Sequence, residues 1–222
     1  SERRDNNPRA SRRGLLPRAG AEPTLIMNIA NRITLSRLAL AVLFVAVMTV
    51  RFAYSFTVAL LIFAIAGITD YWDGKIARKY GMITSFGALI DPLVDKILVS
   101  SALIFFLTVP FLGIPAWTVI VIISREFAVT GLRLVAASRG KVLPAVKAGK
   151  HKTAVQIATV IVILLYLSLR EIAPSTALYS EAQLDSVSLP LILAMMLASA
   201  VLTVYSGAMY LVRNKDVLLE DI

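Results

Sequence analysis

Long, nearly uninterrupted apolar segments follow one another along most of the chain. Each approaches the ~20 residues that an α-helix needs to cross a bilayer. Short breaks rich in Pro, Gly or charged residues separate them, at Arg51, 110–113, Gly140 and 170–190. The pattern predicts an all-α integral membrane protein with six transmembrane helices, near residues 32–50, 53–77, 84–108, 114–138, 152–169 and 188–212.

Composition supports this interpretation. Of the 222 residues, 58% are hydrophobic and the mean hydropathy is +0.77, which excludes an ordinary soluble domain. The chain contains no cysteine, so disulfides contribute nothing to its stability. Residues 1–26 differ from the rest, because they hold six arginines among Pro and Gly and show no apolar periodicity. We therefore expect a disordered basic tail over 1–26 and a membrane domain over 27–222.

The net charge of +9 is unevenly distributed. Its basic residues flank the apolar segments, so an anionic lipid surface explains them better than nucleic acid does. If the N-terminus is inside, the outer connections hold only Arg51 and Arg170. The sequence thus predicts a multi-pass protein of the cell membrane with both termini cytoplasmic.

Four carboxylates stand where the second apolar segment ends and the third begins. Asp70 and Asp73 are three residues apart, and Asp91 and Asp95 are four apart. On helices each pair shares a face. Ionisable groups at membrane depth cost free energy and usually mark a functional site. Two such helices would bring four carboxylates together, and hard divalent cations with oxygen ligands would relieve their repulsion. The alternative is that these carboxylates are merely solvated at a loop.

Small and basic residues complete this motif. Gly74 and Ala77 leave room for a ligand, and Arg78 provides a planar cation suited to phosphate. The whole pattern reads D-x2-D-G-x2-A-R, eight further residues, then G-x3-D-x3-D. Asn31, Thr34 and Arg37 recur on roughly one face at the same predicted end of the first segment.

A second polar group interrupts the fourth segment. Arg125, Glu126 and Arg133 lie among apolar residues, and Lys147 and Lys152 follow in a basic stretch. Arg binds phosphate through two parallel N–H groups of its planar guanidinium, and Lys binds it through a compact ammonium charge. We therefore expect a pocket for a phosphorylated acceptor. Glu126 has an alternative reading as the partner in a structural ion pair, and the sequence leaves its role, catalytic or structural, open.

The aspartate motif resembles that of the CDP-alcohol phosphotransferases, and eight positions at fixed spacing carry the resemblance. From residue 27 onward, the stretches NIANRITLSR and SREFAVTGLR and the following GK segment look like the phosphatidylglycerolphosphate synthase branch of that family. Ala30 departs from the pattern, which commonly has proline before the Asn-x-x-Thr element, and the basic tail lies outside it.

The resemblance implies a fold of six transmembrane helices, a homodimer, and a reaction. Its location would be the bacterial cell membrane. The orientation given by the basic residues places the aspartates on the inner side, so the active site is expected to face the cytoplasm. The reaction is transfer of a phosphatidyl group from CDP-diacylglycerol to sn-glycerol 3-phosphate with release of CMP. It implies two Mg²⁺ or Mn²⁺ ions held by Asp70, Asp73, Asp91 and Asp95, with Asp95 as the candidate base.

Substrate contacts follow from the same resemblance. CDP-diacylglycerol would be bound by Asn31, Thr34, Arg37, Asp70, Gly74, Ala77 and Arg78, and the acceptor phosphate by Arg125, Arg133, Lys147 and Lys152.

Two alternatives remain open. The first keeps the chemistry but changes the acceptor to inositol phosphate, or to phosphatidylglycerol. The second is a divalent-cation carrier that uses the aspartates as its ion site, although such a carrier needs no Gly-x-x-Ala-Arg between carboxylates.

Overall fold

The computed structural model describes residues 23–80, 85–138, 140–141, 147–175 and 179–215. Within helices, residues 23–34, 70–80, 85–92, 95 and 147–148 are described by their backbone alone.

Six α-helices make up the described chain, as the apolar pattern predicted. Two single-turn 3-10 helices, η1 (Pro110–Leu112) and η2 (Ala173–Ser175), stand in the connections. The α-helices are α1 (Pro23–Val50), α2 (Ser55–Tyr80), α3 (Ser85–Phe106), α4 (Ala116–Ser138), α5 (Lys147–Ile172) and α6 (Glu181–Arg213).

Three helices begin earlier than the hydrophobic pattern indicated. α5 begins at Lys147 rather than near residue 152. α1 begins at Pro23, inside the segment expected to be tail, and proline is favoured in the first turn of a helix. α6 begins at Glu181 rather than near residue 188. Its first turn is capped by Ser180, whose side chain accepts from the Gln183 backbone N–H while Gln183 accepts from the Ser180 backbone. The cap allows the helix to start in polar sequence, and Pro190 lies inside the same helix.

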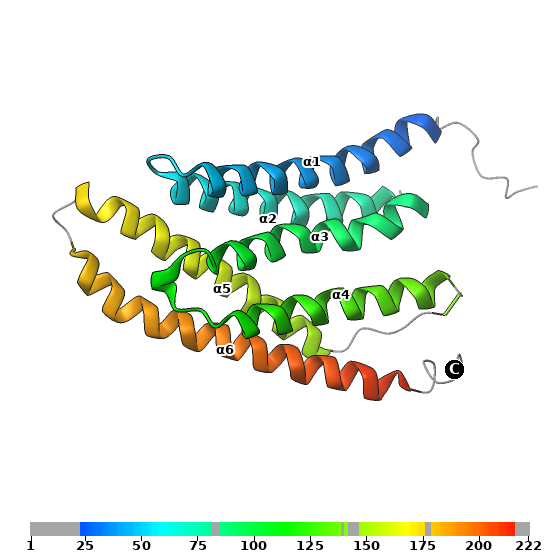
Figure 1. Ribbon diagram of the computed structural model, residues 1–222. Coiled ribbons are helices and arrows are strands. Elements are labelled where there is room, and N and C mark those ends of the chain that lie inside the picture. The colour runs from blue at the N-terminus through cyan, green and yellow to red at the C-terminus, as the bar shows by residue number, and fades with distance from the viewer. Residues whose placement is uncertain (1–22, 81–84, 139, 142–146, 176–178, 216–222) are drawn as a thin grey trace, which may run out of the picture.

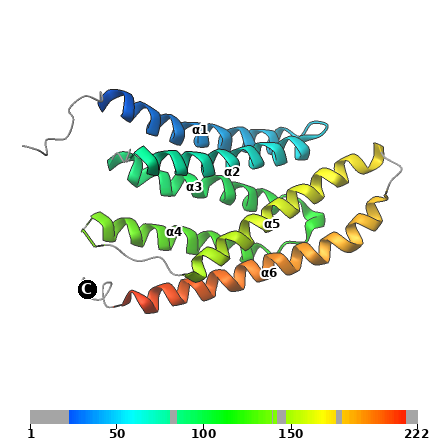
Figure 2. The same cartoon turned by 180° about the vertical axis from the view of Figure 1, so that it is seen from behind.

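The helices run back and forth along one direction (Figure 1). α1, α2 and α3 form one group, α4 and α6 run alongside each other, and α5 crosses between the two groups (Figures 1 and 2). α5 packs against α6 and α2 and also meets α3. Its buried residues Val160, Ile163, Leu164 and Leu167 therefore lie at the centre of the hydrophobic core.

One end of the bundle gathers the segments of chemical interest. The first turns of α1 and the last turns of α6 both lie at the right-hand end in Figure 1. The end of α2, the start of α3 and the end of α4 lie there too. The helix ends that carry the predicted aspartates and Arg133 thus lie at the same end of the bundle as the start of α1 and the end of α6.

The opposite end is closed by polar contacts that satisfy one another. Glu171 accepts from the backbone N–H groups of Phe56 (3.1 Å) and Thr57 (3.4 Å), which caps α2. Asp185 accepts from Arg170 Nε at 3.0 Å and from the Tyr166 hydroxyl at 2.6 Å. The Arg170 guanidinium also lies 4.1 Å from the centre of the Phe111 ring.

The outward surfaces suit a lipid environment. Among the described residues, the helices over Gly149–Ile172 and Glu181–Arg213 are long and apolar enough to cross a membrane. Shorter apolar helical stretches cover Leu35–Val50, Ser55–Thr69 and Lys96–Phe106. Large apolar side chains also remain exposed on α6, where Val187 is 72% and Val201 66% accessible.

A buried carboxylate joins three helices of the bundle. Glu126 on α4 is 5% exposed. It pairs with Lys96 of α3 at 2.9 Å, with its neighbour Arg125 at 3.6 Å, and with Lys152 of α5, whose side chain is fully buried. We call these four residues the Glu126 cluster. Because removing one partner leaves the others charged and buried, the cluster fixes how α3, α4 and α5 meet.

We expect Glu126→Gln to lower the apparent Tm of the detergent-solubilised protein by roughly 10 °C. Loss of one partner of a buried pair costs about 3–5 kcal/mol, and each kcal/mol is about 2–4 °C for a chain of this size. Adding Lys152→Met should restore part of the loss, because the uncompensated ammonium is then gone.

Glu181→Gln is the matched control. Glu181 pairs with Arg170 at 3.1 Å but its side chain is 45% exposed, so its loss should change Tm little. Equal effects of the two single substitutions, or no recovery in the double variant, would contradict this role for Glu126.

Candidate functional site

The four predicted aspartates lie on two helices that reach the same end of the bundle. Asp70 and Asp73 are in the C-terminal part of α2, and Asp91 and Asp95 are in the N-terminal half of α3. These spacings place each pair on one helical face. The four side chains lie outside the described residues. Among the side chains that are described, no three of His, Asp or Glu come together as a metal site.

Other predicted residues share this limit. The helical backbone is described but the side chains are not for six of them: Asn31 and Thr34 on α1, Gly74, Ala77 and Arg78 on α2, and Lys147 on α5.

A cavity of about 120 Å³ connects the turns next to the aspartates. Ala66 and Gly67 of α2, one turn before Asp70, line it together with Val94 of α3, the residue before Asp95. The remaining wall is apolar and comes from α2, α3 and α5: Phe63, Leu98, Val99 and Ile157. The carboxylate-bearing parts of α2 and α3 therefore border one common space.

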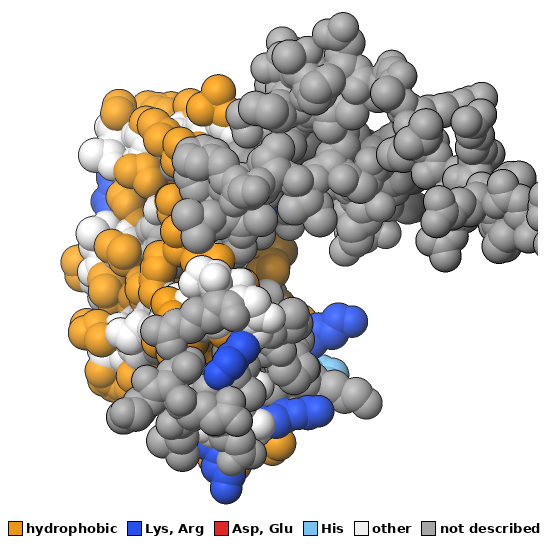
Figure 3. Space-filling view, turned by 90° about the vertical axis from the view of Figure 1, so that its right-hand side faces the viewer, with side chains coloured by type: hydrophobic (Ala, Val, Ile, Leu, Met, Phe, Trp, Pro, Cys, Tyr) orange, Lys and Arg blue, Asp and Glu red, His pale blue; other side chains and the backbone are white. Residues whose placement is uncertain are grey.

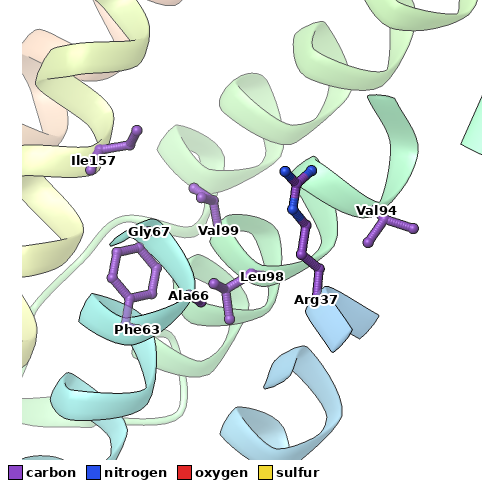
Figure 4. Close-up of a pocket in the computed structure, with 8 residues that line it drawn as sticks. All are labelled: Arg37, Phe63, Ala66, Gly67, Val94, Leu98, Val99 and Ile157. Atoms are coloured by element: carbon purple, nitrogen blue, oxygen red, sulfur yellow. The ribbon is translucent and has the colours of Figure 1, made fainter. Parts of the chain in front are cut away.

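Arg37 is the charged residue of this cavity wall. Its side chain extends from α1 alongside α3, toward the turn that carries Val94 (Figure 4). A guanidinium in an otherwise apolar wall is suited to hold an anionic group whose neighbour is apolar, such as a phosphate attached to lipid.

Arg125 and Arg133, the predicted anion ligands on α4, are both turned toward α6. A Cβ at Gly207 of α6 would stand only 3.2 Å from Arg125 Cγ, so the Arg125 side chain passes directly over this glycine. The guanidinium carbon of Arg133 lies 5.1 Å from the ring centre of Tyr210, a cation–π distance. Arg133 is exposed, whereas the Arg125 side chain is 17% exposed.

Lys152 and Glu126 differ from the two arginines. The Lys152 side chain is completely buried and contacts the Glu126 carboxylate. The structure thus shows Glu126 in ion pairs, which matches the structural alternative left open by the sequence. Its partners are Lys96, Arg125 and Lys152.

Sequence reasoning missed three residues of this region: Lys96, Gly207 and Tyr210. Lys96 directly follows Asp95 and could have been suspected as a second intramembrane charge. Gly207 and Tyr210 carry no such signal, because a glycine and a tyrosine are ordinary in an apolar helix.

The charged side chains described on the surface at this end are basic. Figure 3 looks onto it and shows Lys and Arg side chains gathered in the lower half, with no described acidic side chain in view. The exposed basic residues described around α4, α5 and α6 are Arg133, Lys150, Arg213 and Lys215. These four side chains would attract an anion that approaches them from the solvent.

Comparisons with known proteins agree with this arrangement. A profile of the CDP-alcohol phosphatidyltransferase family matches residues 27–205. The CDP-diacylglycerol–glycerol-3-phosphate 3-phosphatidyltransferase of Bacillus subtilis is 42% identical over 205 residues, covering 87% of this chain and 98% of that protein.

A probable phosphatidylglycerophosphate synthase of Mycobacterium tuberculosis is 44% identical over 147 residues, 64% of this chain and 68% of that protein. A chloroplastic/mitochondrial relative from Arabidopsis thaliana, named CDP-diacylglycerol–glycerol-3-phosphate 3-phosphatidyltransferase 1, is 37% identical over 151 residues, 63% of this chain and 51% of that protein. The profile spans most of the chain, including both aspartate pairs and both arginines of α4, and the chain belongs to the CDP-alcohol phosphatidyltransferase family.

Proposed function

We propose that the protein transfers the phosphatidyl group of CDP-diacylglycerol to sn-glycerol 3-phosphate, giving phosphatidylglycerol phosphate and CMP. The observation that carries the proposal is the 42% identity to a relative named for this reaction, over 98% of that relative's length. The basic surface and the paired arginines of α4 support a phosphorylated acceptor.

The cavity supports a lipid-linked donor. Its apolar wall would accommodate the glyceride part of CDP-diacylglycerol, and Arg37 would face the diphosphate. Asn31 and Thr34 would add hydrogen bonds, Gly74 and Ala77 would let cytidine approach α2, and Arg78 would hold its phosphate.

Enzymes of this family use divalent metal ions. The donor set fits a hard cation, since four carboxylates lie on helices whose adjoining turns border one cavity. Two Mg²⁺ or Mn²⁺ ions held by Asp70, Asp73, Asp91 and Asp95 would neutralise the diphosphate and the charge on departing CMP.

The reaction needs a base and a positioned acceptor. A hydroxyl oxygen of glycerol 3-phosphate bonds to the phosphatidyl phosphorus, the bond from phosphorus to CMP breaks, and Asp95 takes the hydroxyl proton. Arg125 and Arg133, with Lys147, would hold the acceptor phosphate so that its hydroxyl is in line. The Lys152 ammonium already contacts Glu126, so Lys152 would not bind the phosphate directly. It would instead help to position Arg125, which belongs to the same Glu126 cluster.

We further propose that all six helices span a bacterial plasma membrane, with the catalytic end and both termini cytoplasmic. An even number of spans agrees with the start of α1 and the end of α6 lying at one end of the bundle (Figure 1). A homodimer remains a prediction from the family resemblance.

Labelled CDP-diacylglycerol incubated with the purified protein and one acceptor at a time tests the substrate. We expect CMP release with glycerol 3-phosphate and little with inositol phosphate or phosphatidylglycerol. Turnover with inositol phosphate instead would favour the first alternative. Metal uptake into sealed vesicles without any CMP release would favour a cation carrier.

Asp95→Asn should reduce turnover by at least about a hundredfold, because the amide keeps the shape of the side chain but cannot accept the proton. Binding of CDP-diacylglycerol, measured by titration, should persist. Glu181→Gln, at the far end of the bundle, is the control with full turnover expected. Unaltered turnover in Asp95→Asn would exclude this residue as the base.

Arg133→Ala should raise KM for glycerol 3-phosphate by about tenfold or more, since a hydrogen bond from a charged donor is lost. KM for CDP-diacylglycerol should change little. Arg213→Ala removes an equally exposed arginine at the same end of the bundle and should leave both constants unchanged. If Arg133→Ala changed KM for CDP-diacylglycerol but not KM for glycerol 3-phosphate, the acceptor pocket would lie elsewhere.

A further inference from the structure

Two buried hydrogen-bond donors at the contact between α4 and α6 have no acceptor. Arg125 Nε and the Tyr210 hydroxyl are both inaccessible to solvent, and neither has a hydrogen-bond partner among the described residues. The whole Tyr210 residue is 1% exposed. Buried polar groups of native proteins are nearly always paired, so an unpaired one points to a missing water, ion or ligand.

The two donors belong to one small region. Gly207 and Tyr210 are three residues apart on α6 and therefore share a face. Gly207 lies under the Arg125 side chain and Tyr210 lies under the Arg133 guanidinium. Arg125 is also in electrostatic contact with Arg133 and with Tyr210. A ligand that reaches both arginines is thus close to the tyrosine.

The charge of this region favours an oxyanion over water. A guanidinium has donors only, and a tyrosine hydroxyl can donate. Among the described side chains, the carboxylate paired with Arg125 is Glu126, 3.6 Å from Nη1, and it already contacts Lys96 and Lys152. Within the described part of this region, positive charge and unused donors therefore exceed the acceptors. Arg133 is exposed, so an anion from the solvent can reach its guanidinium.

We propose that α6 completes the acceptor site: the Tyr210 hydroxyl donates a hydrogen bond to the acceptor phosphate between Arg125 and Arg133, and Gly207 keeps Arg125 in place for it. This inference rests on the proposed function, because the phosphate is taken to be that of the acceptor. The Tyr210 ring has a second role, since it supports the Arg133 guanidinium on its face.

Tyr210→Phe is the decisive variant, because it retains the ring beneath Arg133 and removes only the hydroxyl. We expect KM for glycerol 3-phosphate to rise about tenfold, while kcat and KM for CDP-diacylglycerol stay within twofold. Tm of the ligand-free protein should be unchanged or higher, since an unsatisfied buried hydroxyl is removed. Tyr205→Phe is the matched control: Tyr205 lies on the same helix but is 55% exposed, so the substitution should have no effect on these constants.

Gly207→Ala tests the positioning role. The added Cβ would lie 3.2 Å from Arg125 Cγ, so the arginine must shift, and KM for the acceptor should rise about threefold or more without change for the lipid. Gly131→Ala on α4 is the control, because the structure shows nothing within 4 Å of a Cβ there.

Inorganic phosphate separates this inference from the proposed reaction. It should inhibit competitively against the acceptor, and Tyr210→Phe should raise its inhibition constant by the same factor as KM. If the wild-type protein uses a different phosphorylated acceptor, the proposed function fails. The role of Tyr210 is then tested by comparing KM for that acceptor, and the inhibition constant of phosphate, between the wild type and Tyr210→Phe. Unchanged acceptor KM and phosphate inhibition in Tyr210→Phe, or a lowered Tm, would overturn the role of Tyr210 while the reaction stands.

Discussion

The bundle depends on one buried carboxylate that is shared by cations from three helices. Glu126 on α4 holds Lys96 of α3 and Lys152 of α5, and it also contacts Arg125. In a low-dielectric interior none of these charges can be left alone without a large desolvation cost. The cluster therefore restricts α3, which carries two of the aspartates, relative to α4, which carries the arginines. The two halves of the candidate site are held together by this pairing.

The polar groups at the two ends of the molecule differ in whether their hydrogen bonds are satisfied. At one end, Glu171 accepts from the start of α2, and Arg170, Tyr166 and Asp185 satisfy one another. At the other end, donors at Arg125 and Tyr210 are buried and have no acceptor among the described residues. A closed set of hydrogen bonds stabilises the fold, whereas unused donors beside surplus positive charge are available to an anion. This contrast distinguishes the end at which chemistry is proposed.

Much of the arrangement was predictable from the sequence because it follows local rules. Apolar segments of membrane-spanning length indicated six helices, and the described chain has them. The starts of α1, α5 and α6 were misplaced because the expectation followed hydrophobicity alone. The S-x-x-Q pattern at Ser180–Gln183, a capping box, is a sequence signal for the true start of α6. The partners of Glu126 could not be derived, since Lys96 and Lys152 are 30 and 26 residues away along the chain.

By itself, the sequence determined the helical class, the family and the aspartate motif, because these depend on residue type and on spacing within a few helical turns. Only the tertiary structure decided that Lys152 is bound to Glu126, that Gly67 and Val94 border one cavity, and that Arg125 and Arg133 meet Gly207 and Tyr210. Such contacts depend on how whole helices pack, which is set by the sum of many weak interactions across the core rather than by any short stretch of chain.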